Sequence, residues 1–191
     1  MIIHSVFSAS TLSNIYMISN DKRELVIIDP AEIREELVKH IEENRLNLKG
    51  ILLTQINKPC IEGLLTLGKI YSEPFYSMPE MRDGLLCMKD PGRAISIGDF
   101  RIEAIPMRSH AEESCIFRIE NALFTGNVLY AGRIAATESF MRREALIKEI
   151  NAKIMSLDEN MLIFPGQGPT SKIRIEKMFN IDLIASHASY L

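Results

Sequence analysis

The sequence predicts an α/β protein built as one domain over residues 1–191. Short apolar runs of strand length, such as Ile51–Leu53, alternate with longer segments whose apolar residues recur at helical spacing. Polar loops follow several of these runs, and in open α/β sheets binding sites lie where strands end. A chain of 191 residues is long enough for a single domain with a sizeable core.

Composition and charge exclude several classes of protein. Hydrophobic residues make up 47% of the chain, and the net charge of −3 offers no basic surface for nucleic acid or an anionic membrane. No apolar stretch reaches membrane-spanning length, and the N-terminus lacks the basic region of a signal peptide. The cysteines Cys60, Cys87 and Cys115 are an odd set without paired spacing. We therefore expect a cytoplasmic protein with reduced thiols.

Strand and helix patterns alternate through the first half of the chain. Strands are predicted at residues 2–7, 15–18, 25–28, 51–53 and 75–77. A hairpin turn over Asn20–Arg23 joins the second and third of these strands. Apolar spacing predicts helices over Glu32–Asn44 and Ile61–Tyr71, and Asn47–Gly50 is predicted as a turn. Prolines and glycines in residues 78–93 predict a loop with one helical turn.

The second half continues this alternation. Residues 95–106 predict a Gly-Asp turn followed by a strand with one solvent-exposed face, because apolar residues at 100, 102 and 104 alternate with charged residues. Further strands are predicted at residues 115–119, 122–124 and 161–164. A long helix is predicted over Ser139–Leu157, and Ser171 is predicted to cap a final helix.

Four polar loops at strand ends carry the functional pattern. Thr54–Cys60 stands where a known family has Thr-His-x-His-x-Asp-His, and Pro106–Ser114 aligns with its Pro-Gly-His-Thr loop. Thr125–Asn127 replaces Thr-Gly-Asp, and Pro165–Gly168 has Gln in place of His in Pro-Gly-His-Gly. With the corner at Asp29-Pro30, this order of loops resembles the metallo-β-lactamase superfamily, in its glyoxalase II-like branch.

The resemblance implies an αβ/βα four-layer sandwich, with two mixed sheets face to face and helices outside. It also implies a hydrolytic site in which two metals, zinc or iron, lie about 3.5–4 Å apart and activate a bridging water. Seven positions match the family's ligands: Gln55, Asn57, Pro59, Cys60, His110, Asn127 and Gln167. Only His110 keeps the family's residue, so six of the seven positions are changed.

The residues at these positions are poor metal ligands. A ligand must present a lone pair without a proton, as neutral His, thiolate and carboxylate do, whereas amide oxygens are weak donors and proline offers none. His110 and Cys60 alone keep ligand chemistry, and the resemblance assigns them to different metals. Catalytic zinc normally has three protein ligands. We therefore expect no metal cofactor and a degenerate site, in a binding or regulatory pseudoenzyme.

Two enzymatic alternatives stay open. The glyoxalase II-like resemblance implies a hydrolase of thioesters or related esters, with an atypical metal or water held by His110. A thiol-dependent enzyme would instead use Cys60 and His110 as catalytic residues. A helix N-terminus and nearby Lys58 or Arg108 would then lower the pKa of the Cys60 thiol. The simpler interpretation is a buried apolar Cys60, with His110 hydrogen-bonded to Asn57, Gln55 or water.

A small molecule is the expected partner of the pocket that these loops form. Asn127 and Gln167 are expected to fill the former metal volume with an amide network, because carboxamides can satisfy one another. Neither nucleic acid nor a membrane is an expected partner, and the formation of an oligomer stays open. Arg133 is expected to hold the loop that follows Asn127.

Overall fold

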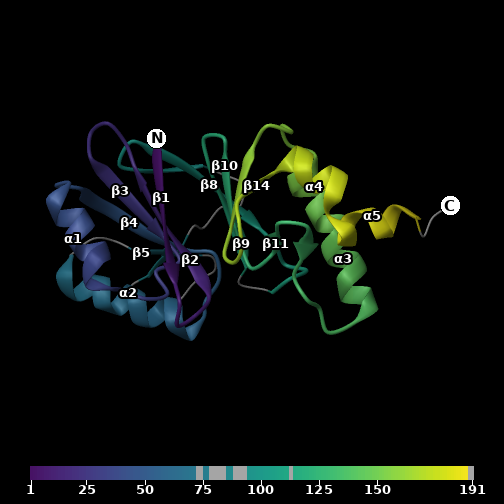
Figure 1. The fold of residues 1–191 in the computed structure, drawn as a ribbon, viewed down its shortest axis with the longest axis horizontal. Helices are drawn as coiled ribbons and strands as arrows, with labels where there is room; N and C mark the ends of the chain where they lie inside the picture. Colours follow the sequence, from purple (N-terminus) through teal and green to yellow (C-terminus); the bar gives the residue numbers. More distant parts are fainter. Residues whose placement is uncertain (72–74, 78–84, 88–93, 112–113, 189–191) are drawn as a thin grey trace.

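Two mixed sheets form the centre of the molecule (Figure 1). The structure is a computed structural model that describes residues 1–71, 75–77, 85–87, 94–111 and 114–188. The first sheet contains, in spatial order, β1 (Ile2–Ser8), β2 (Ser13–Ser19), β3 (Glu24–Ile28), β4 (Asn47–Leu53), β5 (Phe75–Ser77) and β6 (Leu85–Cys87). The second contains β14 (Ser171–Lys172), β13 (Leu162–Pro165), β10 (Ala122–Gly126), β9 (Cys115–Ile119), β8 (Phe100–Pro106) and β7 (Ile95–Ile97). A separate hairpin consists of β11 (Leu129–Tyr130) and β12 (Arg133–Ile134).

Helices cover the outer face of each sheet. The first sheet carries α1 (Glu35–Glu43) and α2 (Lys58–Ile70). The second carries α3 (Phe140–Ile150), a π-helical turn at Asn151–Met155, α4 (Ile173–Phe179) and α5 (Ile181–Ala188). The layers therefore run helix, sheet, sheet, helix, which confirms the predicted αβ/βα sandwich. No helix among the described residues has the length and apolar character needed to cross a membrane.

Side-chain alternation along the strands builds three layers of core. In β2, Ile15 and Met17 pack with α1 and α2, whereas Tyr16 and Ile18 pack between the two sheets. Successive side chains of a strand point to opposite faces, so a strand covered on both sides is apolar throughout. This explains why β4 ends in the continuous apolar run Ile51–Leu53.

The structure corrects the expected course of the chain around β4. Asn47–Gly50, expected as a turn, belongs to β4 and pairs in parallel with β3. The next helix begins at Lys58 rather than at Ile61. Of the loop expected over residues 78–93, the structure describes only β6, which pairs in parallel with β5, and the remainder lies outside the described residues.

The C-terminal part also differs from the expectation. The long helix is α-helical only to Ile150 and then widens into the π-helical turn. Ser171 lies in β14 and does not cap α4, whose N-terminal flanking residue is Lys172 without a side-chain cap. The Ser171 hydroxyl instead donates to the buried carboxylate of Glu176. The sequence analysis did not predict α5.

Candidate functional site

The loop after β4 is shaped by the cap of α2. The side-chain oxygen of Asn57 accepts a hydrogen bond from the Cys60 backbone N–H at 2.9 Å. Pro59 lies in the first turn of the helix. Backbone N–H groups there have no acceptor within the helix, so a proline costs no hydrogen bond. Asn57 and Pro59 therefore have structural roles at positions where the resembled family has metal ligands.

A close backbone approach brings the ends of β4 and β10 together. Gly126 has a φ of +51°, and a Cβ atom there would lie 2.3 Å from Thr54 Oγ1. Only glycine combines this left-handed conformation with so close a contact. The Gly166 N–H donates to the Gly126 carbonyl at 2.7 Å, and the Asn14 N–H donates to the Gly166 carbonyl at 2.8 Å. Loops from both sheets therefore meet at one end of the sandwich.

These loops enclose a cavity of about 290 Å³, called here the amide pocket. Six of the seven positions matched to family ligands line it: Gln55, Asn57, Pro59, Cys60, Asn127 and Gln167. The other lining residues are Thr11, Ser13, Asn14, Asp29, Ala31, Thr54 and Gly166. The fold thus gathers, in one place, residues that the sequence distributes over separate loops.

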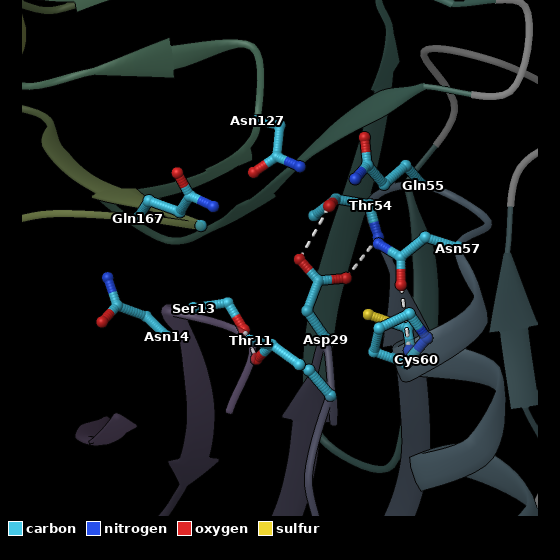
Figure 2. A pocket seen from close by; sticks show the side chains of 13 residues that line it. Thr11, Ser13, Asn14, Asp29, Thr54, Gln55, Asn57, Cys60, Asn127 and Gln167 are labelled. Atoms are coloured by element: carbon cyan, nitrogen blue, oxygen red, sulfur yellow. Dashed lines mark hydrogen bonds between the residues drawn. The ribbon is translucent and has the colours of Figure 1, made fainter. Parts of the chain in front are cut away.

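Three carboxamides face the amide pocket without a hydrogen-bond partner among the described residues: Gln55, Asn127 and Gln167. Figure 2 shows them along one side of the pocket, opposite the turn that follows β1. The expected amide network between Asn127 and Gln167 is not formed among the described residues, since their side chains share no hydrogen bond. Each carboxamide offers one acceptor and two donors, so all three can bind a ligand.

Asp29 is a pocket residue that the sequence analysis used only as the end of a strand. Its carboxylate accepts hydrogen bonds from the Thr54 backbone N–H at 2.8 Å and from the Thr54 hydroxyl at 2.7 Å (Figure 2). Burial raises the pKa of Asp29 to about 6, although the hydrogen bonds from Thr54 favour the ionised form. The available signal in the sequence is an acidic residue directly after four apolar ones, at Leu25–Ile28.

Cys60 lies buried in the first turn of α2. Its side chain is only 3% exposed. Burial, together with the nearby Asp29 carboxylate, raises the pKa of the Cys60 thiol well above its usual range. The thiol-dependent alternative needs this pKa to be lowered by the helix N-terminus and by Lys58 or Arg108, and the shift has the opposite direction. A protonated and enclosed thiol is a poor nucleophile.

His110 is not among the described residues that line the amide pocket. It lies in the turn after β8, where its backbone N–H donates to the Met107 carbonyl at 3.1 Å. The turn is attached to α3 because the Glu149 carboxylate accepts from the Ser109 N–H at 2.8 Å. Burial lowers the pKa of His110, which favours the neutral imidazole. Among the described residues His110 shares no hydrogen bond with Asn57, Gln55 or Cys60, so the expected bonds to these three side chains are not formed.

The residues of the amide pocket do not fit the binuclear metal centre that the resemblance implies. In the described part of the chain, no three His, Cys, Asp or Glu side chains form a group that could hold a metal ion. The Asn57 oxygen caps a helix, the Cys60 side chain is buried, and both Asp29 oxygens accept hydrogen bonds from Thr54. The remaining polar groups are neutral amides and hydroxyls. This donor set suits hydrogen bonding rather than metal coordination.

Comparisons with known proteins agree with the fold. No family model matches the chain. Its sequence is 28% identical over 193 positions to the hydroxyacylglutathione hydrolase GloC of Haemophilus influenzae, a match that covers 87% of this chain and 91% of that protein. It is 23% identical over 186 positions to the probable metallo-hydrolase YqgX of Bacillus subtilis, with coverage of 85% and 87%. The crystal structure of the BLEG-1 B3 metallo-β-lactamase superposes with a TM-score of 0.83 at 23% identity, covering 95% of this chain and 99% of that one.

The two-sheet sandwich and the crystal structure that it matches define the class: a protein with the metallo-β-lactamase fold. The sequence relatives, which are 28% and 23% identical, support the metallo-β-lactamase superfamily and its glyoxalase II-like branch.

Proposed function

We propose that this protein is a binding member of the superfamily, which holds a small, neutral, polar molecule in the amide pocket and does not carry a binuclear metal site. The observation that carries the proposal is the donor set of the pocket, in which three carboxamides without a hydrogen-bond partner in the described part of the chain occupy positions of family ligands. Amide groups bind neutral polar ligands well because each offers donors and an acceptor at once.

The charges around the amide pocket favour a neutral ligand over an anionic one. None of the described lining residues is Lys, Arg or His, so no cation would compensate a buried negative charge. Asp29 lies among the lining residues, and with a pKa of about 6 it is mostly ionised at neutral pH. An anionic ligand would meet this carboxylate in a partly enclosed space.

A hydrolase acting on thioesters is the second candidate. The similarity to GloC, which extends over 87% of this chain, favours it. This candidate requires a group that activates water in the amide pocket. A hydrolase would turn over a hydroxyacylglutathione thioester, whereas a binding protein would leave the thioester intact.

Side-chain amide signals in ¹H–¹⁵N NMR spectra test the proposal. Nicotinamide is a neutral carboxamide, and nicotinate is its anionic counterpart of the same size. We expect nicotinamide to shift the amide signals of Gln55 and Asn127 and nicotinate to leave them in place. Asn127→Ala should abolish this binding. Asn121→Ala is the matched control, since Asn121 is exposed in the turn at the opposite end of β10.

Two results would overturn the proposed function. One is nicotinamide binding that Asn127→Ala and Asn121→Ala affect equally, because the amide pocket would then not be the binding site. The other is hydrolysis of a hydroxyacylglutathione thioester that depends on added zinc or iron and is lost in Asn127→Ala. That second result would establish the hydrolase.

A further inference from the structure

A second cavity, called here the arginine pocket, adjoins the amide pocket through a shared residue. Gln167 lines both cavities. The arginine pocket has a volume of about 570 Å³ and lies between the β11–β12 hairpin, α3 and α5. Its described lining residues are Tyr130, Ala131, Arg133, Ile134, Ala135, Ala136, Arg143, Gln167, Gly168, Pro169 and Asp182.

One buried carboxylate orients the two arginines of this cavity. Asp182 Oδ1 accepts from an Arg143 guanidinium N–H at 2.7 Å and lies 3.4 Å from Arg133 Nη1. Its other oxygen accepts from the Ile134 backbone N–H at 2.9 Å. Burial opposes ionisation of Asp182, but these hydrogen bonds and ion pairs outweigh it and lower the pKa of the carboxyl. Asp182 is therefore ionised at neutral pH.

The charges of this cluster do not cancel. Two guanidinium groups face a single carboxylate, which leaves one positive charge at the arginine pocket. One arginine would be enough to neutralise Asp182 and to hold the hairpin. The side chain of Arg133 is 63% exposed and that of Arg143 is 36% exposed, so a ligand from solvent can reach both.

Most hydrogen-bond donors of the two arginines are available to a ligand. Each guanidinium has five N–H donors in a planar fork, and among the described residues each side chain donates only to Asp182. Planar forks of this kind match the oxygen pairs of carboxylates and phosphates. Because Asp182 already holds the Arg143 guanidinium at 2.7 Å, part of the rotational freedom of that side chain is lost before a ligand binds.

We propose that Arg133 and Arg143 form a binding subsite for an oxyanion, the carboxylate or phosphate of a ligand whose neutral polar part occupies the amide pocket. The connection through Gln167 and the opposite charge preferences of the two cavities support a single ligand with two ends. This inference rests on the proposed function for its neutral end, whereas the oxyanion subsite rests on the arginines alone.

Titration with inorganic phosphate and with acetate at low ionic strength tests the subsite. We expect at least one of these anions to shift the Nε–H signals of Arg133 and Arg143 in NMR spectra. Preference for phosphate would indicate a phosphate ester, and preference for acetate a carboxylate. Arg133→Gln should lower the affinity for the preferred anion about tenfold, because one charge-assisted contact is lost. Arg143→Lys should also lower this affinity, because an ammonium group keeps the positive charge but lacks the planar pair of N–H donors.

Arg142→Gln is the matched control. Arg142 precedes Arg143 in α3, pairs with Glu138 at 3.9 Å and does not line the arginine pocket. If Arg142→Gln and Arg133→Gln lower anion binding equally, the binding depends on surface charge in general. That result would overturn the subsite. The absence of any shift with both anions would overturn it as well.

Binding of both probes at once separates this inference from the proposed function. Nicotinamide and the preferred anion should occupy the protein together, and Arg133→Gln should leave nicotinamide binding unchanged. Mutual displacement of the two probes would overturn the two-ended ligand. If the anion binds and nicotinamide does not, the proposed function fails while the oxyanion subsite stands. If only nicotinamide binds, the subsite fails and the proposed function stands.

Discussion

At the residue scale, Asp29 links two strand ends and sets the charge of the amide pocket. It lies directly after β3, has a φ of +51° and binds Thr54 at the end of β4 through both carboxylate oxygens. A left-handed backbone is uncommon for a residue with a side chain, and such positions persist where surrounding contacts fix them. Burial raises the pKa of the Cys60 thiol, and the Asp29 carboxylate adds to this shift.

Asp29→Asn should remove a pH dependence of stability. Folding raises the pKa of Asp29 from 3.8 to about 6. Between these values the folded state keeps a proton that the unfolded state has released, so stability falls as the pH rises through this range. The shift corresponds to about 3 kcal/mol of unfolding free energy. Urea unfolding at about pH 4 and about pH 7 measures it in the wild type and in the variant.

The comparison isolates Asp29 because all other groups titrate in both proteins. The unfolding free energy of the wild type minus that of Asp29→Asn should be larger at the lower pH. A difference that stays constant, or that grows as the pH rises, would show that Asp29 titrates normally in the folded protein.

Cys60 should resist alkylation in the native protein. A thiol that is 3% exposed and has a raised pKa forms little thiolate, which is the reactive species. Treatment with iodoacetamide, followed by peptide mass spectrometry, should find Cys60 unmodified before denaturation and modified after it. Rapid labelling of Cys60 in the folded protein would restore the thiol-dependent enzyme as a candidate.

At the element scale, α2 positions the pocket through one close contact. A Cβ atom at Gly63 would lie 1.5 Å from the Pro30 carbonyl oxygen, so the helix rests directly on the corner after β3. The N-terminus of the same helix carries Asn57, Pro59 and Cys60 into the amide pocket. The distance between α2 and Pro30 therefore determines where these residues lie in the amide pocket.

Gly63→Ala should destabilise the protein, and Gly68→Ala should not. At position 63 the added methyl group forces α2 away from a rigid backbone, which costs about 1–3 kcal/mol. Gly68 lies in the same helix and is exposed, so alanine there should stabilise by about 0.5–1 kcal/mol through its higher helix propensity. Chemical denaturation of both variants gives the comparison. Equal effects at the two positions would mean that α2 does not rest on Pro30.

At the scale of the whole molecule, apolar layers account for the fold without a metal. One core cluster lies between the two sheets, and one lies between each sheet and its helices. The polar pocket lies at the edge of these clusters, where loops from both sheets are joined by backbone hydrogen bonds such as Gly166 to Gly126. The apolar layers and these backbone hydrogen bonds therefore join the two sheets.

Chelation should leave the melting temperature unchanged. A ligand stabilises the folded state only to the extent that it binds it, and the amide pocket has no suitable donor set for a metal. We expect calorimetric melting curves with and without EDTA to coincide, and elemental analysis to find less than about one zinc or iron per chain. Two metals per chain, with a large loss of melting temperature in EDTA, would contradict the assignment of the site.

Local sequence patterns were sufficient to predict strands that are buried on both faces. The apolar runs at Ile15–Ile18 and Leu25–Ile28 specify β2 and β3 because both faces of each strand are covered. Asn47–Gly50 was wrongly expected as a turn, since its residues favour turns locally. Parallel pairing with β3 overrides that preference, and such pairing joins residues that are distant in the chain.

The sequence by itself determined most strands and helices, because alternation of apolar residues is a local property, and its loop motifs predicted the sandwich fold through their resemblance to a family. Only the tertiary structure decided which residues meet. It brought Asp29 to Thr54, gathered the amides of Gln55, Asn127 and Gln167, and left His110 outside the described wall of the pocket. These outcomes depend on how closely separate loops approach, and that distance is set by packing between layers rather than by any one segment.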